Sequence, residues 1–147
     1  MSAAVPPWLI AAIGELGVVE TPGPGDNPRV VEYHANTTLK ATDDEVAWCS
    51  SFVNWCMKQA GVKGTDSAAA RSWLLWGTKL GTPKLGCVVV LSRGSNPAQG
   101  HVGFYLDKSA TGSGGVYIVN GNVGDRVAVS AFPTTRVLGY RVPASSS

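Results

Sequence analysis

The chain has 147 residues, of which 44% are hydrophobic and 15% are charged, and its formal net charge is +2. This length and hydrophobic content are typical of one globular domain, and they exclude an intrinsically disordered chain. So small a net charge, with no cluster of Lys and Arg, argues against nucleic acid as a partner. We therefore expect a single domain over residues 1–147, with flexible ends at 1–6 and 143–147.

The first half of the sequence is predicted to be helical. Residues 8–17 form the first helix, with Pro7 in its first turn and Gly17 at its C-terminal cap. The apolar stripe of this helix consists of Leu9, Ala12, Ile13 and Leu16. Three further helices are expected over residues 29–35, 48–60 and 67–75. A connection rich in turn residues follows over 77–86.

The second half of the sequence changes to strand patterns. Five runs of apolar or alternating residues predict strands at 87–91, 100–106, 115–120, 126–132 and 137–142. Short loops between successive strands favour an antiparallel meander. Because the helices come first and the strands later, we predict an α+β domain, with N-terminal helices packed on an antiparallel sheet of about five strands.

The chain has three cysteines, Cys49, Cys56 and Cys87, an odd number that is too small for a disulfide framework. Cys49 and Cys56 are separated by roughly 10 Å along the predicted helix, which is too far for a bridge. The ligand pairs of a zinc site need closer spacing, so we expect free thiols and no metal. Neither a signal peptide nor a stretch long enough to span a membrane is recognisable, so we expect no membrane insertion.

Cys49 is the strongest candidate for a chemical role, because it lies at the predicted start of the helix over 48–60. Backbone N–H groups without helical partners and the positive end of the helix dipole would stabilise a thiolate there. The alternative is that Cys49 is a small buried hydrophobic residue.

A thiol nucleophile needs a base, and the base needs a third group that fixes its orientation. His101 lies on a predicted strand between Gly100 and Gly103 and is the candidate base, although a half-buried strand histidine of no chemical role fits as well. Asn122 follows the next strand, where antiparallel pairing would place it beside His101. The surrounding residues are also typical of a hairpin turn, which is the alternative for Asn122.

Three further residues are candidates for substrate contact. Glu20 adjoins a Pro-Gly turn and would meet a substrate amine, or it is an ordinary surface carboxylate. Trp48 and Trp76 would stack on a sugar or a peptide, although aromatic residues at helical spacing more often pack in a core. Cys56 and Cys87 are expected in the core, since no histidine lies near either in a usable motif.

Two motifs resemble a known family. The segment WCSSFVNWC at 48–56 and the segment GHVGFY at 100–105 resemble the CHAP branch of the NlpC-type papain-like peptidoglycan hydrolases. That branch includes short single-domain phage endolysins, whose lead-in is similar to residues 17–33 of this chain. The resemblance covers nearly the whole chain, and it implies a papain-like fold and an amidase or peptidase that acts on cell-wall peptide.

The resemblance also implies roles for individual residues. Cys49 would be the nucleophile, His101 the base and Asn122 the orienting group. The family often has an acidic residue or glycine two positions before that Asn, where this chain has Asn120, so Asn120 is a rival for the third role. Some relatives hold calcium through alternating aspartates before the Cys. The acidic run at 43–45 lacks that alternation, so neither a metal nor another cofactor is expected.

An endolysin-like protein of this kind would accumulate as a monomer in the host bacterial cytoplasm. It would reach peptidoglycan, its expected partner, once a holin opened the membrane. One alternative is an antibacterial effector of the same chemistry, exported by a secretion machine. Another is a non-catalytic wall-binding or structural module of a phage particle, against which the intact Cys/His pair argues.

Overall fold

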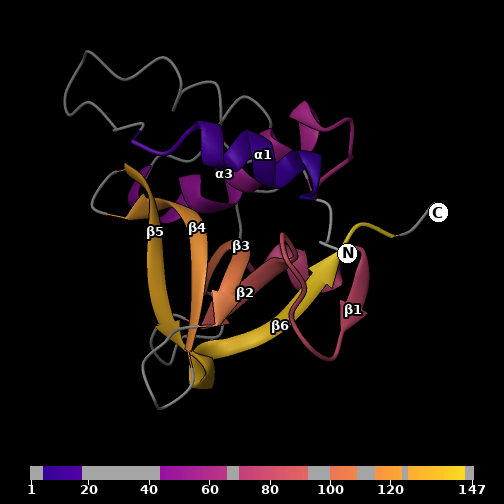
Figure 1. Cartoon of the computed structure of the whole chain (residues 1–147), viewed down its shortest axis with the longest axis vertical. Helices are drawn as coiled ribbons and strands as arrows, with labels where there is room; N and C mark the ends of the chain where they lie inside the picture. Colours follow the sequence, from indigo (N-terminus) through magenta and orange to yellow (C-terminus); the bar gives the residue numbers. More distant parts are fainter. Residues whose placement is uncertain are drawn as a thin grey trace.

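A computed structural model of the chain describes residues 5–17, 44–65, 70–92, 100–108, 115–123 and 126–144. Helices come first and an antiparallel sheet follows, which confirms the α+β class. Helices α1 (Pro7–Gly14) and α3 (Asp44–Gln59) pack against each other and lie on one side of a strongly curled sheet (Figure 1). The helix expected over 29–35 lies outside the described residues. No helix in the described part is long and apolar enough to cross a membrane.

The sheet has six strands rather than about five, in the order β1-β6-β2-β3-β4-β5. The strands are β1 (Thr78–Leu80), β2 (Val88–Ser92), β3 (Gly100–Lys108), β4 (Gly115–Val123), β5 (Arg126–Pro133) and β6 (Val137–Val142). The additional strand, β1, lies inside the segment that we predicted as a turn-rich connection. Its composition gives no strand signal, and it is a strand because its backbone pairs with β6.

The predicted meander holds for only part of the sheet. Strands β2 to β5 follow one another in space as in sequence, each antiparallel to the next. After β5 the chain turns through a short 3-10 helix, η2 (Thr134–Arg136), and β6 crosses to the other side of β2. Figure 1 shows β6 running from the end of β5 towards β1. This pairing removes β2 from the sheet edge, where its unpaired backbone groups would be exposed.

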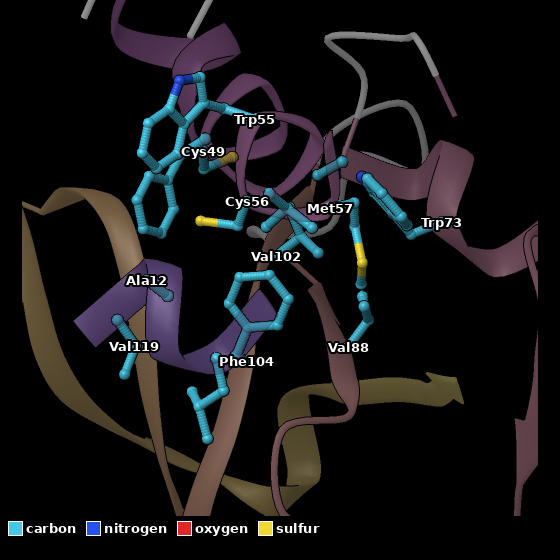
Figure 2. Packing of buried hydrophobic residues seen from close by; sticks show 14 of the residues in the cluster. Ala12, Cys49, Trp55, Cys56, Met57, Trp73, Val88, Val102, Phe104 and Val119 are labelled. Atoms are coloured by element: carbon cyan, nitrogen blue, oxygen red, sulfur yellow. The ribbon is translucent and has the colours of Figure 1, made fainter. Parts of the chain in front are cut away.

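Two apolar clusters hold the fold together. The helix-side core joins α1 and α3 to one face of the strands, and it includes Cys49, Phe52, Val102, Phe104 and Val119 (Figure 2). The strand core fills the other face of the curled sheet, and it includes Cys87, Val89, Leu91, Val116 and Ile118. Alternation along each strand divides its side chains between the two cores. The buried positions of Cys56 and Cys87 confirm that both are core residues.

The helices differ from the prediction at their ends. Helix α3 begins at Asp44, about one turn before the predicted start at Trp48. Helix α1 ends at Gly14, and the chain then turns through Gly17, whose N–H donates to the carbonyl oxygen of Val127 at 3.1 Å. In the predicted helix over 67–75, the described residues form a 3-10 helix, η1 (Ala70–Leu75).

The apolar stripe predicted for α1 is only half correct. Leu9 and Ala12 are buried against α3, whereas Ile13 and Leu16 are 44% and 42% exposed. Leu16 falls outside the helix because α1 stops two residues earlier. The predicted stripe therefore contains one position beyond the end of the helix, Leu16, and one helical position that does not face the core, Ile13.

Candidate active site

His101 and Asn120 are brought together by the neighbouring strands β3 and β4. The imidazole Nε2 of His101 lies 2.5 Å from the amide Oδ1 of Asn120. His101 is 2% exposed and Asn120 is fully buried, so this contact is shielded from solvent. The close approach depends on Gly103, because a Cβ at that position would lie 2.9 Å from the Cβ of Asn120. A glycine two residues after His101 thus leaves space for the amide.

The hydrogen bonds of Asn120 fix the direction of its amide. Its Nδ2 donates to the carbonyl oxygen of Ala128 at 2.9 Å and to the Oγ of Ser130 at 3.3 Å. A carbonyl oxygen can only accept, so the NH₂ end of the amide faces β5 and the Oδ1 end faces His101. The Nε2 of His101 must then carry the proton that Oδ1 accepts. In the neutral ring this leaves the lone pair on Nδ1, and an imidazole in that form can remove a proton from a thiol.

Of the two alternatives for the third residue, Asn120 is the one whose bond to His101 the structure describes. Asn122 belongs to the end of β4, and its side chain lies outside the described residues. The sequence favoured Asn122 because it follows a predicted strand that ended at residue 120. Strand β4 in fact continues to Val123, so position 120 lies within it, on the strand next to His101.

Cys49 lies in the second turn of α3 and not at its start, so the sequence-based reason for a stabilised thiolate is wrong. Helix α3 begins five residues earlier, at Asp44, and the helix dipole acts mainly within the first turn. The backbone N–H of Cys49 lies beyond the first turn, where N–H groups have helical partners. The helix end therefore gives no reason to expect a stabilised thiolate at Cys49.

Cys49 is fully buried, as the alternative interpretation of a small core residue also requires. It belongs to the same cluster as Val102 and Val119, which are the chain neighbours of His101 and Asn120 (Figure 2). Helix α3, which carries Cys49, packs on both β3 and β4. Because side chains alternate along a strand, His101 and Asn120 lie on the faces of their strands opposite to Val102 and Val119.

Polar side chains next to Cys49 hold this part of α3 in place. The indole Nε1 of Trp73 donates to the Oγ of Ser50 at 2.9 Å, and both residues are buried. One turn on, Asn54 donates to the backbone oxygen of Ser50 at 3.2 Å and to the Oγ1 of Thr65 at 3.3 Å. Buried and satisfied hydrogen bonds of this kind favour one orientation of the helix over its neighbours.

The other two thiols are poor nucleophiles. Burial, with a smaller contribution from Glu15, raises the pKa of Cys56 well above its usual value. Burial also raises the pKa of Cys87 to about 11, against a smaller lowering by backbone hydrogen bonds. Because the thiolate is the reactive form, neither residue is suited to attack a carbonyl near neutral pH.

Of the three predicted substrate contacts, the structure describes only the side chain of Trp76, and it does not place that side chain at this site. Glu20 lies outside them, and so does the side chain of Trp48. Trp76 lines a pocket of about 330 Å³ at the other end of α3, together with Val62, Lys63, Gly64, Gly77, Pro143 and Ala144. Its indole N–H donates to the backbone oxygen of Lys63 at 3.0 Å, and its ring packs edge-on against Trp73.

Sequence reasoning missed Phe132, which contacts His101. The two ring centroids are 5.5 Å apart. Ala128, Ser130 and Phe132 alternate along β5, and this period-2 pattern was the available signal that they share a face. No signal in the sequence indicates which strand that face would meet. Within the described residues, no three His, Cys, Asp or Glu side chains are grouped as metal ligands would be.

The sequence profile of the CHAP domain matches residues 41–122, which is more than half of the chain. The chain belongs to the CHAP domain family. The matched segment of this CHAP domain contains Cys49, His101 and Asn120, and it implies activity of the peptidoglycan hydrolase type. CHAP domains are usually amidases or peptidases that depend on a cysteine and a histidine, with peptidoglycan as the substrate. A comparison with curated proteins finds no match.

Proposed function

We propose that this CHAP domain hydrolyses an amide bond of peptidoglycan by a thiol mechanism in a papain-like fold. Cys49 is the nucleophile, His101 the base and Asn120 the group that orients the base. The observation that carries the proposal is the hydrogen bond between His101 and Asn120, with the amide held from its other end by β5. That arrangement sets the tautomer a cysteine hydrolase needs.

In the first half of the reaction, Nδ1 of His101 accepts the thiol proton of Cys49. The sulfur then forms a bond to the amide carbonyl carbon. The tetrahedral intermediate collapses when the imidazolium gives its proton to the leaving nitrogen, and a thioester remains. During this step the positive ring is stabilised by its Nε2–H bond to Asn120, since hydrogen bonds from charged donors are stronger than those from neutral ones.

In the second half, the neutral imidazole removes a proton from water, and the hydroxide adds to the thioester carbon. The sulfur leaves as thiolate, takes the proton back and releases a carboxylic acid. The sum of the two halves is one water added across one amide bond. The bond is either that between muramic acid and L-alanine or one within the stem or cross-bridge peptide.

We further propose that the protein acts as an endolysin. It would be held as a monomer in the host cytoplasm until a holin opens the membrane, and it would need no metal or cofactor. An exported antibacterial effector would use the same chemistry. The full burial of Cys49 favours one different candidate, a wall-binding module without catalysis, because a nucleophile must be reached by its substrate.

Mass spectrometry of purified peptidoglycan after digestion tests the proposal. The expected products carry one added water at an amide, and new amino termini on L-alanine identify an amidase, whereas new termini on a later residue identify an endopeptidase. Intact peptidoglycan to which the protein remains bound would instead support the binding module.

A further inference from the structure

The His101 ring contacts a side chain to which the proposed mechanism assigns no role. Phe132 on β5 packs on the imidazole with ring centroids 5.5 Å apart and ring planes inclined by 42°. Phe132 is itself only half-buried, whereas His101 is almost completely buried. The phenyl ring is thus a more exposed neighbour of the imidazole, on the face of β5 that also carries Ser130, a hydrogen-bond partner of Asn120.

Arg136 in η2 holds Phe132 from outside. Its guanidinium carbon lies 4.9 Å from the centroid of the Phe132 ring, within the range of a cation–π contact. The same guanidinium donates from Nε and Nη2 to the backbone oxygen of Ser92 at 3.1 Å and 2.8 Å. Ser92 is the last residue of β2 and pairs with Gly100, the residue before His101. One arginine therefore connects the phenyl ring to the backbone at the end of β2, which is paired with the start of β3.

We propose that Phe132 and Arg136 are positioning residues, which keep water away from the hydrogen bond between His101 and Asn120 and hold the imidazole plane in place. A hydrogen bond is stronger where water cannot compete for its donor. Phe132 excludes the water, and Arg136 keeps Phe132 and the start of β3 in a fixed relation. The link to catalysis rests on the proposed function, whereas the shielding of the bond does not.

The exchange of the Nε2 proton of His101 with solvent, followed by NMR on nitrogen-labelled protein, tests the shielding directly. We expect a slowly exchanging proton in the wild type, and exchange at least about tenfold faster in Phe132→Ala and in Arg136→Met. Phe132→Tyr keeps the ring and should show slow exchange. Arg136→Lys keeps the charge but loses the two-bond contact with Ser92, so its exchange should stay fast. Val129→Ala, an exposed position on the same strand, is the matched control and should leave exchange unchanged.

The indole proton of Trp73 separates a specific effect from general loosening, because it is bonded to Ser50 within the helix-side core. If it exchanges faster to the same extent as the His101 proton, Phe132 is merely structural and the proposal is overturned. Unchanged His101 exchange in folded Phe132→Ala and Arg136→Met overturns it as well. Should Phe132→Ala not fold, Phe132→Leu is measured in its place with the same expected direction.

Activity supplies the second readout. With peptidoglycan as substrate, we expect kcat to fall about tenfold in Phe132→Ala with KM unchanged, since the ring acts on the base and not on the substrate. If the His101 proton exchanges faster in Phe132→Ala but the wild type solubilises no peptidoglycan, the shielding is upheld and the proposed function is refuted. A rise in KM at unchanged kcat would refute the positioning role.

Discussion

Replacing Asn120 with alanine removes all the hydrogen bonds of its amide at a fully buried position, and the two shortest of them join it to His101 and Ala128. The Nε2–H of His101 loses its acceptor at 2.5 Å, and the carbonyl oxygen of Ala128 loses a donor at 2.9 Å. A buried group that loses its hydrogen-bond partner costs about 1–3 kcal/mol. A total loss of about 2 kcal/mol in the free energy of unfolding would lower the melting temperature by roughly 4–8 °C in a domain of this size.

The effect on catalysis should be separate from the effect on stability. A hydrogen bond to a charged imidazolium contributes about 1.5–3 kcal/mol, which corresponds to a fall in kcat of roughly 10- to 100-fold. The assay is the rate at which purified peptidoglycan is solubilised, measured at a temperature where thermal unfolding shows the variant to be folded. Asn120→Asp should not rescue it at neutral pH, because a carboxylate oxygen would face the carbonyl oxygen of Ala128.

Asn122→Ala is the matched control, with the same change two positions along the same strand. We expect its rate to stay within about twofold of wild type, because the proposed mechanism assigns the orienting role to Asn120. If Asn122→Ala loses activity while Asn120→Ala keeps it, the third residue has been assigned to the wrong side chain. If both keep wild-type rates, His101 needs no orienting amide.

Three further predictions concern the surroundings of the site. Gly103→Ala should lower both the melting temperature and the rate of peptidoglycan solubilisation, because its methyl group would lie 2.9 Å from the Cβ of Asn120. Overpacking of this kind costs about 1–3 kcal/mol. Wild-type activity of the variant would refute the tight fit. Stability should fall as pH rises from about 9 towards 11, because Cys56 and Cys87 stay protonated in the folded state while the unfolded chain ionises. For Cys87 alone the loss is on the order of 2 kcal/mol. Denaturant unfolding at about pH 8 and about pH 11 measures it, and equal stability would contradict the raised pKa values. Trp76→Ala should weaken binding to peptidoglycan in a sedimentation assay. It should leave kcat unchanged, since its pocket lies at the far end of α3 from Cys49. Unchanged binding would remove Trp76 from the substrate contacts.

The strand that carries His101 could be predicted from sequence because its signals are local. His101 lies among apolar residues and small glycines, and these alone indicate a buried strand with room for close approach. The core positions of Cys56 and Cys87 follow from equally local patterns. Such predictions need no knowledge of which elements become neighbours.

The contact between His101 and Asn120 depends on the pairing of two strands, and such pairing is not a local property of the sequence. Asn120 lies beside His101 only because β4 continues past the predicted end and pairs with β3. Phe132 reaches the same imidazole from a third strand, which no spacing in the sequence indicates. The sheet order was equally hidden, since β6 pairs with β2 across a long separation in sequence.

The start of α3 was misplaced for a different reason. The run at 43–45 is acidic and polar, which suits a loop, yet acidic residues are also favourable in the first turn of a helix. Helix α3 begins within that run, at Asp44. Cys49 consequently lies beyond the first turn of the helix, so the proposed mechanism relies on His101, and not on the helix end, to form the thiolate.

The rate at which purified peptidoglycan is solubilised by Cys49→Ala tests the central claim most directly. Cys56→Ala is its matched control, since Cys56 lies on the same helix, is equally buried and undergoes the same change. We predict no detectable solubilisation by folded Cys49→Ala and near wild-type solubilisation by folded Cys56→Ala. Solubilisation by Cys49→Ala at the wild-type rate would contradict the thiol mechanism.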